Sequence, residues 1–125
     1  MWREYNPNPI SRRVTDCSVR AVCIALDLDW DTAYMLIAIN GMLMGDMMDI
    51  NDVWGSVLRQ HGFYRKDVKD SCPDCYTVAD FCRDNPQGLF VIGTNKHVVT
   101  AISGDWYDIW DSGNEPVEFF WYRKE

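Results

Sequence analysis

The stretch Thr15-Asp16-Cys17-Ser18-Val19-Arg20-Ala21-Val22 predicts a helix that begins at a cysteine. Thr15 or Asp16 can cap the first exposed N–H groups, and the residues that follow keep a helical apolar spacing. Cys17 is therefore expected in the first turn, where the partial positive charge of the helix N-terminus favours thiolate over thiol. Arg20, one turn further on, can add a second positive charge near the sulfur. A half-buried structural cysteine fits the same segment, so residues elsewhere in the chain must decide between the two roles.

The composition predicts one domain that spans residues 1–125. With 47% hydrophobic and 14% aromatic residues, the chain can bury one ordinary core but hardly two. The formal net charge is −7 and the basic residues form no long run, which argues against a nucleic-acid partner, because the phosphate backbone binds clustered Lys and Arg. Residues 1–5 lack the apolar region of a signal peptide, and no apolar stretch approaches membrane-spanning length. We therefore expect a cytoplasmic protein with no membrane partner.

Five cysteines are an odd number in a chain without a secretion signal, so we expect reduced thiols, at least one of them free. Cys72-Pro73-Asp74-Cys75 lies in the polar segment 64–76, a predicted surface excursion. A structural zinc site needs four ligands, and only His61 and Cys82 could complete one. We interpret the motif as a turn shaped by its proline, with a zinc clip on an adaptor or a redox dithiol as alternatives. His61-Gly62 is better explained as the end of a helix, where the imidazole can satisfy last-turn carbonyls.

The periodicity of the apolar residues changes from helical to alternating at the turn Asn85-Pro86-Gln87-Gly88. Before this turn the pattern predicts helices that begin near residues 17, 29, 51 and 77, after a turn-rich lead-in over residues 1–14. After it the pattern predicts four strands: Leu89–Ile92, Lys96–Ile102, Trp106–Asp111 and Val117–Tyr122. Helices first and an antiparallel sheet last indicate the α+β class.

The hairpin between the second and third of these strands brings a histidine close to an acid. If Ser103-Gly104-Asp105 forms the turn, His97 lies directly opposite Asp111 and both side chains point to the same face. A carboxylate there would orient the imidazole, which could then take a proton from a thiol and return it to a leaving group. Asp108, nearer the turn, is the alternative acid. A two-residue turn would shift the register by one and put Asp111 on the wrong face.

A cysteine at the start of the first core helix, several helices, a histidine strand and then an acidic strand follow the order of the papain-like cysteine peptidase fold. The segments Lys96–Ile102 and Tyr107–Ser112 resemble the histidine and aspartate strands of compact members such as bacteriocin-processing leader peptidases. The Asp-Cys-x-x-Arg-Ala phrase is similar to one in small uncharacterised papain-like proteins of phages and gut bacteria. This resemblance implies that Cys17 is the nucleophile, His97 the general base and Asp111 the orienting acid.

The sequence departs from the papain-like pattern at the oxyanion donor. Papain-like peptidases usually carry a glutamine a few residues before the cysteine, and this chain has none there. Since the loop Asn6-Pro7-Asn8-Pro9 runs into the cysteine, Asn8, or Asn6 as the second choice, could donate its side-chain amide beside the Cys17 N–H. Alternatively, these asparagines only shape a loop.

Together the residues predict a thiol hydrolase or acyltransferase that forms an acyl-enzyme on an amide, isopeptide or ester bond of a peptide or protein substrate. The predicted chemistry includes no cofactor and no bound metal. If neither asparagine serves as an oxyanion donor, the alternative is a catalytically inactive papain-like domain that binds a protein partner.

Overall fold

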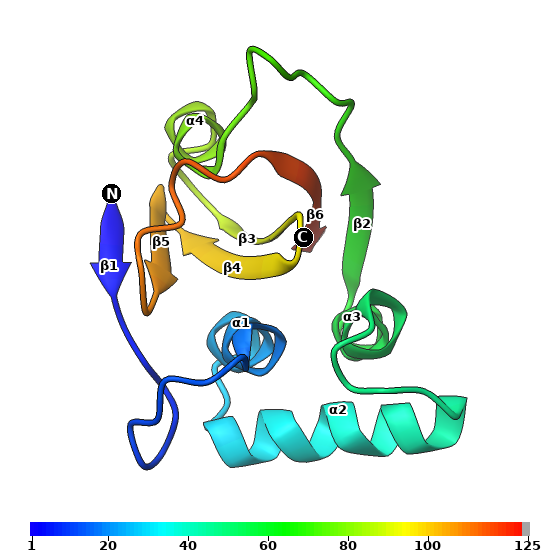
Figure 1. Ribbon diagram of the computed structural model, residues 1–125. Helices are drawn as coiled ribbons and strands as arrows, with labels where there is room; N and C mark the ends of the chain where they lie inside the picture. The colour runs from blue at the N-terminus through cyan, green and yellow to red at the C-terminus, as the bar shows by residue number, and fades with distance from the viewer. Residues whose placement is uncertain (124–125) are drawn as a thin grey trace.

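A six-stranded mixed sheet, with the strand order β1-β5-β4-β3-β6-β2, lies at the centre of the computed structural model, which describes residues 1–123 (Figure 1). β1 runs parallel to β5, and every other neighbouring pair is antiparallel. The strands are β1 (Trp2–Glu4), β2 (Phe63–Asp67), β3 (Leu89–Thr94), β4 (His97–Ile102), β5 (Asp105–Asp108) and β6 (Val117–Arg123).

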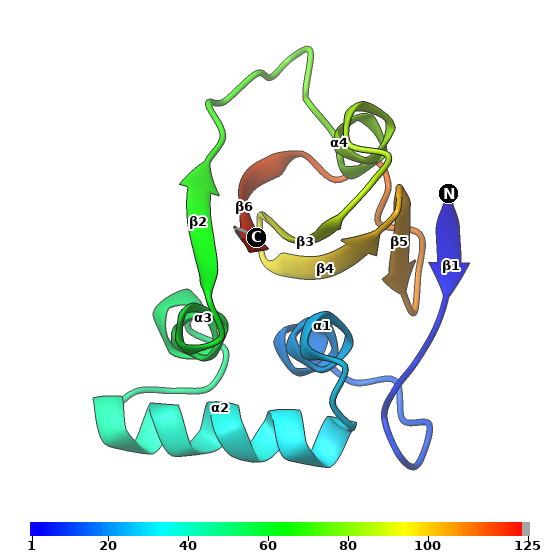
Figure 2. The ribbon, with the colours of Figure 1, turned by 180° about the vertical axis from the view of Figure 1, so that it is seen from behind.

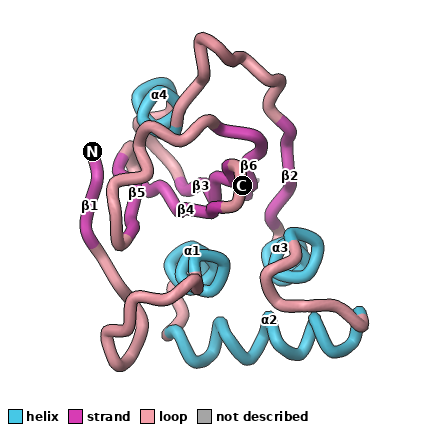
Figure 3. The backbone as a smooth tube through the Cα atoms, in the orientation of Figure 1, coloured by secondary structure: helices cyan, strands magenta, loops and turns pink. Residues whose placement is uncertain are grey.

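Helices pack on both faces of the sheet, as opposite views of the ribbon show (Figures 1 and 2). α1 (Cys17–Leu26) packs on β4 and β3, and α3 (Asn51–Gln60) lies beside it, next to β2. α2 (Trp30–Met44) packs on α1 and α3 as an outer layer (Figure 3). α4 (Val78–Asp84) lies on the other side of the sheet. The predicted α+β class is confirmed, but the expected antiparallel sheet is mixed, because β1 runs parallel to β5.

Each face of the sheet has its own hydrophobic core. Between the sheet and α1 to α3, the largest buried side chains are Trp54, Trp121 and Phe63. On the α4 face, Phe81 packs with residues of the central strands such as Ile92 and Val99. Along β4, Val98 belongs to the first core and Val99 to the second, because successive side chains of a strand point to opposite faces of the sheet.

The turn between β4 and β5 differs from the prediction. Ile102 pairs with Asp105, so the turn contains only Ser103 and Gly104. Both have positive φ, 52° and 82°, as a type I′ turn requires, and this turn matches the twist of the flanking strands. The predicted three-residue turn was therefore wrong. The true register places position 108 opposite position 99, on the same face as His97, and moves position 111 out of phase.

Two edge strands were missing from the prediction. β1 lies within the segment expected to be a turn-rich lead-in, and β2 begins the segment expected to be a surface excursion. After Phe63 every residue of β2 is exposed, so its sequence has no apolar alternation to reveal a strand. Within residues 1–123, no helix has the length and apolar character needed to cross a bilayer.

Candidate active site

A histidine and a buried carboxylate meet at adjacent ends of two neighbouring strands. His97 is the first residue of β4, and Asp108 is the last residue of β5. His97 Nε2 lies 2.6 Å from Asp108 Oδ2, and the Asp108 side chain has no exposed surface. An imidazole that is bonded through Nε2 has only Nδ1 left for a second partner, so the carboxylate fixes both the ring orientation and its protonation pattern.

Asp111 does not lie against the histidine, so the predicted pairing of His97 with Asp111 is corrected to His97 with Asp108. Asp111 follows the end of β5, and its Oδ1 accepts hydrogen bonds from Trp106 Nε1 and from the Gly113 N–H, both at 3.0 Å. The physical reason is the two-residue turn. One residue fewer in the turn reverses which side chains of the second strand face those of the first.

Both oxygens of the Asp108 carboxylate are hydrogen-bonded, each to two partners. Oδ1 accepts from Arg20 Nη1 at 2.7 Å and from the Ile109 N–H at 2.8 Å, and Oδ2 accepts from the Ser112 hydroxyl at 2.7 Å as well as from the histidine. Burial on its own would raise the pKa of Asp108, but the bonds from His97, Ser112 and Arg20 outweigh it and hold the pKa below its usual value. Asp108 is therefore a stable anion beside the imidazole.

Arg20 connects this carboxylate to the helix that carries the cysteine. Its Nε donates to Asp16 Oδ1 at 2.8 Å while its Nη1 donates to Asp108, and the side chains of all three residues are almost fully buried. Trp30 Nε1 donates to the second Asp16 oxygen at 3.0 Å. The Asp16 carboxylate is thus turned away from the start of α1, where it makes no side-chain cap. Sequence reasoning had placed Arg20 near the sulfur but missed its main role between the two acids.

Cys17 is the first residue of α1, and its sulfur is half-buried and not in a disulfide. Burial on its own would raise the pKa of the Cys17 thiol. Bonding to His97 and to the Val98 N–H, the charge of His97 and, more weakly, that of Arg20 outweigh burial and lower the pKa below its ordinary value. In return, although burial opposes it, bonding to Asp108 and Cys17 raises the pKa of His97 to about 9. Opposite shifts in two bonded groups favour the thiolate and imidazolium pair.

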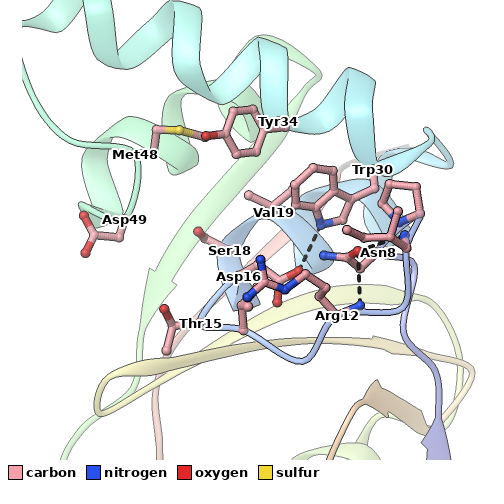
Figure 4. A pocket seen from close by; sticks show the side chains of 13 residues that line it. Asn8, Arg12, Thr15, Asp16, Ser18, Val19, Trp30, Tyr34, Met48 and Asp49 are labelled. Carbon is pink, nitrogen blue, oxygen red and sulfur yellow. Dashed lines mark hydrogen bonds between the residues drawn. The ribbon is translucent and has the colours of Figure 1, made fainter.

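The asparagine predicted to donate to an oxyanion does not lie at the sulfur. Asn8 Oδ1 accepts from the N–H groups of Ile10 and Arg12, so Asn8 shapes the loop before α1, and it lines a neighbouring pocket (Figure 4). The Asn6 side chain likewise bridges the Asn8 N–H and the Arg12 carbonyl. The oxyanion prediction for both asparagines is therefore corrected to the loop-shaping role. The first N–H groups of α1 have no side-chain cap and are donors next to Cys17.

The sulfur and the imidazole line a pocket of about 460 Å³ with a mostly polar wall. Thr15 and Ser18 come from the α1 side, Asn51 and Trp54 from α3, and Asn95 and Lys96 from the turn before β4. The Trp110 ring packs against the His97 ring, with 4.7 Å between the two ring centroids. Trp110 contacts His97, and Ser112 donates to Asp108. No sequence signal identified either residue, since both lie in the irregular segment after β5.

The other cysteines and the second histidine have different environments. Cys72 and Cys75 form a disulfide, contrary to the expectation of reduced thiols there. Burial raises the pKa of both Cys23 and Cys82 to about 11. His61 Nδ1 donates to the Val57 carbonyl at 2.8 Å, in the last turn of α3, as predicted. Across residues 1–123, no group of three or more potential ligand side chains could hold a metal ion.

Comparison with protein-family models, with curated proteins and with solved structures finds no match for this chain. The chemistry of the site must therefore be inferred from its own geometry.

Proposed function

We propose that this chain is a papain-like thiol hydrolase or acyltransferase that acts on an amide, isopeptide or ester bond of a peptide or protein substrate. Cys17 is the nucleophile, His97 the general base and acid, and Asp108 the residue that orients the histidine. The observation that carries the proposal is that Cys17 and His97 line one pocket and His97 Nε2 lies 2.6 Å from the buried Asp108 carboxylate, with the pKa of the thiol lowered by His97.

The electrostatics support this assignment of roles. A thiolate attacks a carbonyl far better than a thiol, and the site lowers the pKa of Cys17 while raising that of His97. The buried Asp108 anion compensates the charge on the imidazole. The helix N-terminus adds a partial positive charge and free N–H groups beside the sulfur.

The reaction has two stages. The Cys17 thiolate attacks the carbonyl carbon to form a C–S bond, and the oxyanion that results is bound by the uncapped N–H groups of Cys17 and Ser18. His97 gives its proton to the leaving nitrogen or oxygen as that bond breaks, which leaves a thioester. His97 then takes a proton from water, or from an acceptor amine or hydroxyl, which attacks the thioester and releases the thiolate.

A second candidate function is a catalytically inactive domain of the same fold that binds a protein partner. The observation that favours it is that neither asparagine before the cysteine donates at the sulfur, since the side chains of Asn8 and Asn6 are both bonded within the loop. In that case the Cys17 thiol would contribute to structure alone.

Acetyl transfer from p-nitrophenyl acetate separates the two functions. The hydrolase should release p-nitrophenolate in a burst, carry an acetyl group on Cys17 by peptide mapping, and then turn over. Cys17→Ser should remove both the burst and the acetyl group, and His97→Ala should slow acylation by about 10² or more. Cys23→Ser, which replaces a buried thiol of raised pKa on the same helix, is the matched control and should leave the burst intact. Acetylation that ignores His97→Ala, or that spreads equally over the free cysteines, would favour the binding domain.

A further inference from the structure

A second pocket adjoins the Cys17 pocket and has a different character. Its volume is about 420 Å³, and it lies between the loop before α1, the outer face of α1 and the start of α2 (Figure 4). Its apolar wall consists of Ile10, Val14, Val19, Trp30, Tyr34 and Met48. The catalytic series described above uses none of these side chains.

The two pockets share part of their walls. Thr15, Ser18 and Asp49 line both of them. Ser18 follows Cys17 directly, with neighbouring Cα atoms about 3.8 Å apart, so the shared wall begins at the residue next to the cysteine. A group attached next to a carbonyl carbon that is bonded to Cys17 can therefore reach the second pocket.

Two polar side chains of the second pocket, Asn8 and Asp16, already have partners, and apolar side chains form much of the remaining wall. Asn8 Oδ1 is bonded to the loop backbone, and Asp16 is bonded to Arg20 and Trp30. Around them, Ile10, Val14 and Tyr34 keep more than a third of their surface exposed, although all three line this pocket. Apolar side chains that remain uncovered beside a reactive thiol are suited to bind an apolar group of its substrate.

We propose that this second pocket is the specificity subsite of the enzyme and binds a bulky apolar group, aromatic or long aliphatic, on the acyl part of the substrate. The inference rests on the proposed function, because it takes Cys17 as the acylated nucleophile. The wall that the two pockets share through Thr15, Ser18 and Asp49 is the reason to assign the occupant to the substrate of that cysteine rather than to a separate ligand.

Two alkylating reagents that differ only in an apolar arm test the subsite. With iodoacetamide and N-(2-phenylethyl)iodoacetamide, the Cys17 thiolate displaces iodide at the same carbon, so that a C–S bond forms as the C–I bond breaks. The ratio of the two rate constants at Cys17, measured by peptide mapping, is divided by the same ratio for free glutathione. We expect a value of about ten in the unaltered protein, the effect of partial burial of a phenyl ring.

Substitutions at the walls should change this normalised ratio. Tyr34→Ala combined with Met48→Ala removes apolar wall and should bring the ratio close to one, and Val14→Trp, which fills the pocket from an exposed loop position, should do the same. Met42→Ala combined with Leu43→Ala is the matched control. It truncates two exposed apolar side chains of α2 that do not line the pocket, and it should leave the ratio near ten.

The outcomes distinguish failure of the subsite from failure of the proposed function. A normalised ratio near one in the unaltered protein, or an equal fall in the α2 control, would overturn the subsite. His97→Ala tests the activation of the thiol instead. It should slow both reagents by the same factor and leave the ratio unchanged, whereas no slowing of either reagent would contradict the proposed function while the ratio still reports on the pocket.

Discussion

Replacing Arg20 by methionine should destabilise the protein more than any other single loss of a charge on the α1 side of the sheet. Arg20 donates to Asp16 at 2.8 Å and to Asp108 at 2.7 Å, and the exposed fractions of the three side chains are 5%, 6% and 0%. Without the guanidinium, two carboxylates remain in a site that water barely reaches. Removal of one partner from a buried ion pair costs about 3–5 kcal/mol, because the charge left behind is uncompensated.

That loss is a large fraction of a typical stability of about 5–15 kcal/mol. Urea unfolding at pH 7, followed by tryptophan fluorescence, measures it as a lower midpoint with little change in slope. Arg83→Met is the matched control, because Arg83 also pairs with two acids, Asp80 and Asp84, but its side chain is 71% exposed. Its loss should be far smaller, since exposed pairs are screened by water. Arg20→Lys should fall between the two, because a single ammonium cannot reproduce a fork that donates in two directions.

A double-mutant cycle identifies the cause of the loss. If Arg20 stabilises the fold by compensating two buried carboxylates, Asp16→Asn should cost less in the Arg20→Met background than in the unaltered protein, with a coupling of about 0.5–3 kcal/mol. Two outcomes would refute the reasoning. One is a loss for Arg20→Met no larger than that for Arg83→Met, and the other is a cycle in which the two losses simply add.

Three further predictions follow from the site and the sheet. Asp108→Asn should slow alkylation of the Cys17 thiol by iodoacetamide at least about tenfold, whereas Asp111→Asn should change the rate little, because Asp111 does not bond to the histidine. Because bonding raises the pKa of His97 to about 9 against an unfolded value of about 6.5, its stabilisation should be complete below pH 6.5 and disappear as the pH rises through about 9. The urea midpoint of the unaltered protein minus that of His97→Gln, followed against pH, measures this, and a difference that grows above pH 9 would contradict it. Gly93→Ala should destabilise the sheet by about 1–3 kcal/mol, because a Cβ there would overlap the Phe119 ring, and a thermal melt that is unchanged would exclude that contact.

The features that local sequence determines were predicted well. The helix at Cys17 and the helix near residue 77 appear as expected, and the strand predicted over Lys96–Ile102 is present from His97. Each follows from a short pattern of caps, apolar spacing or turn residues that is complete within one segment. The nucleophile and the base could therefore be chosen from the chain alone, although their roles remain proposals.

The features that depend on one residue of register were not predictable. A turn of two residues rather than three exchanges Asp111 for Asp108 as the partner of His97. The identity of Ser103 did not indicate the shorter turn, because the left-handed conformation that it adopts is more typical of Asn, Asp or Gly. The error about Asn8 has a different origin. Its position in the chain brings it near the cysteine, but its side-chain oxygen bonds to its own loop, and only the geometry of that loop reveals it.

The buried charges also determine how the two halves of the site meet. Cys17 and Arg20 belong to α1, whereas His97 and Asp108 belong to the hairpin of β4 and β5. Two buried polar contacts away from the sulfur help to join these units, the ion pair of Arg20 with Asp108 and the hydrogen bond at 2.7 Å from the Thr100 hydroxyl to the Ala21 carbonyl. Each of these contacts would break if α1 moved by a fraction of its own pitch, and the groups left behind would be buried without a partner. The distance between sulfur and imidazole is therefore held by polar contacts away from the reacting atoms, and this accounts for an arginine one helical turn after the cysteine.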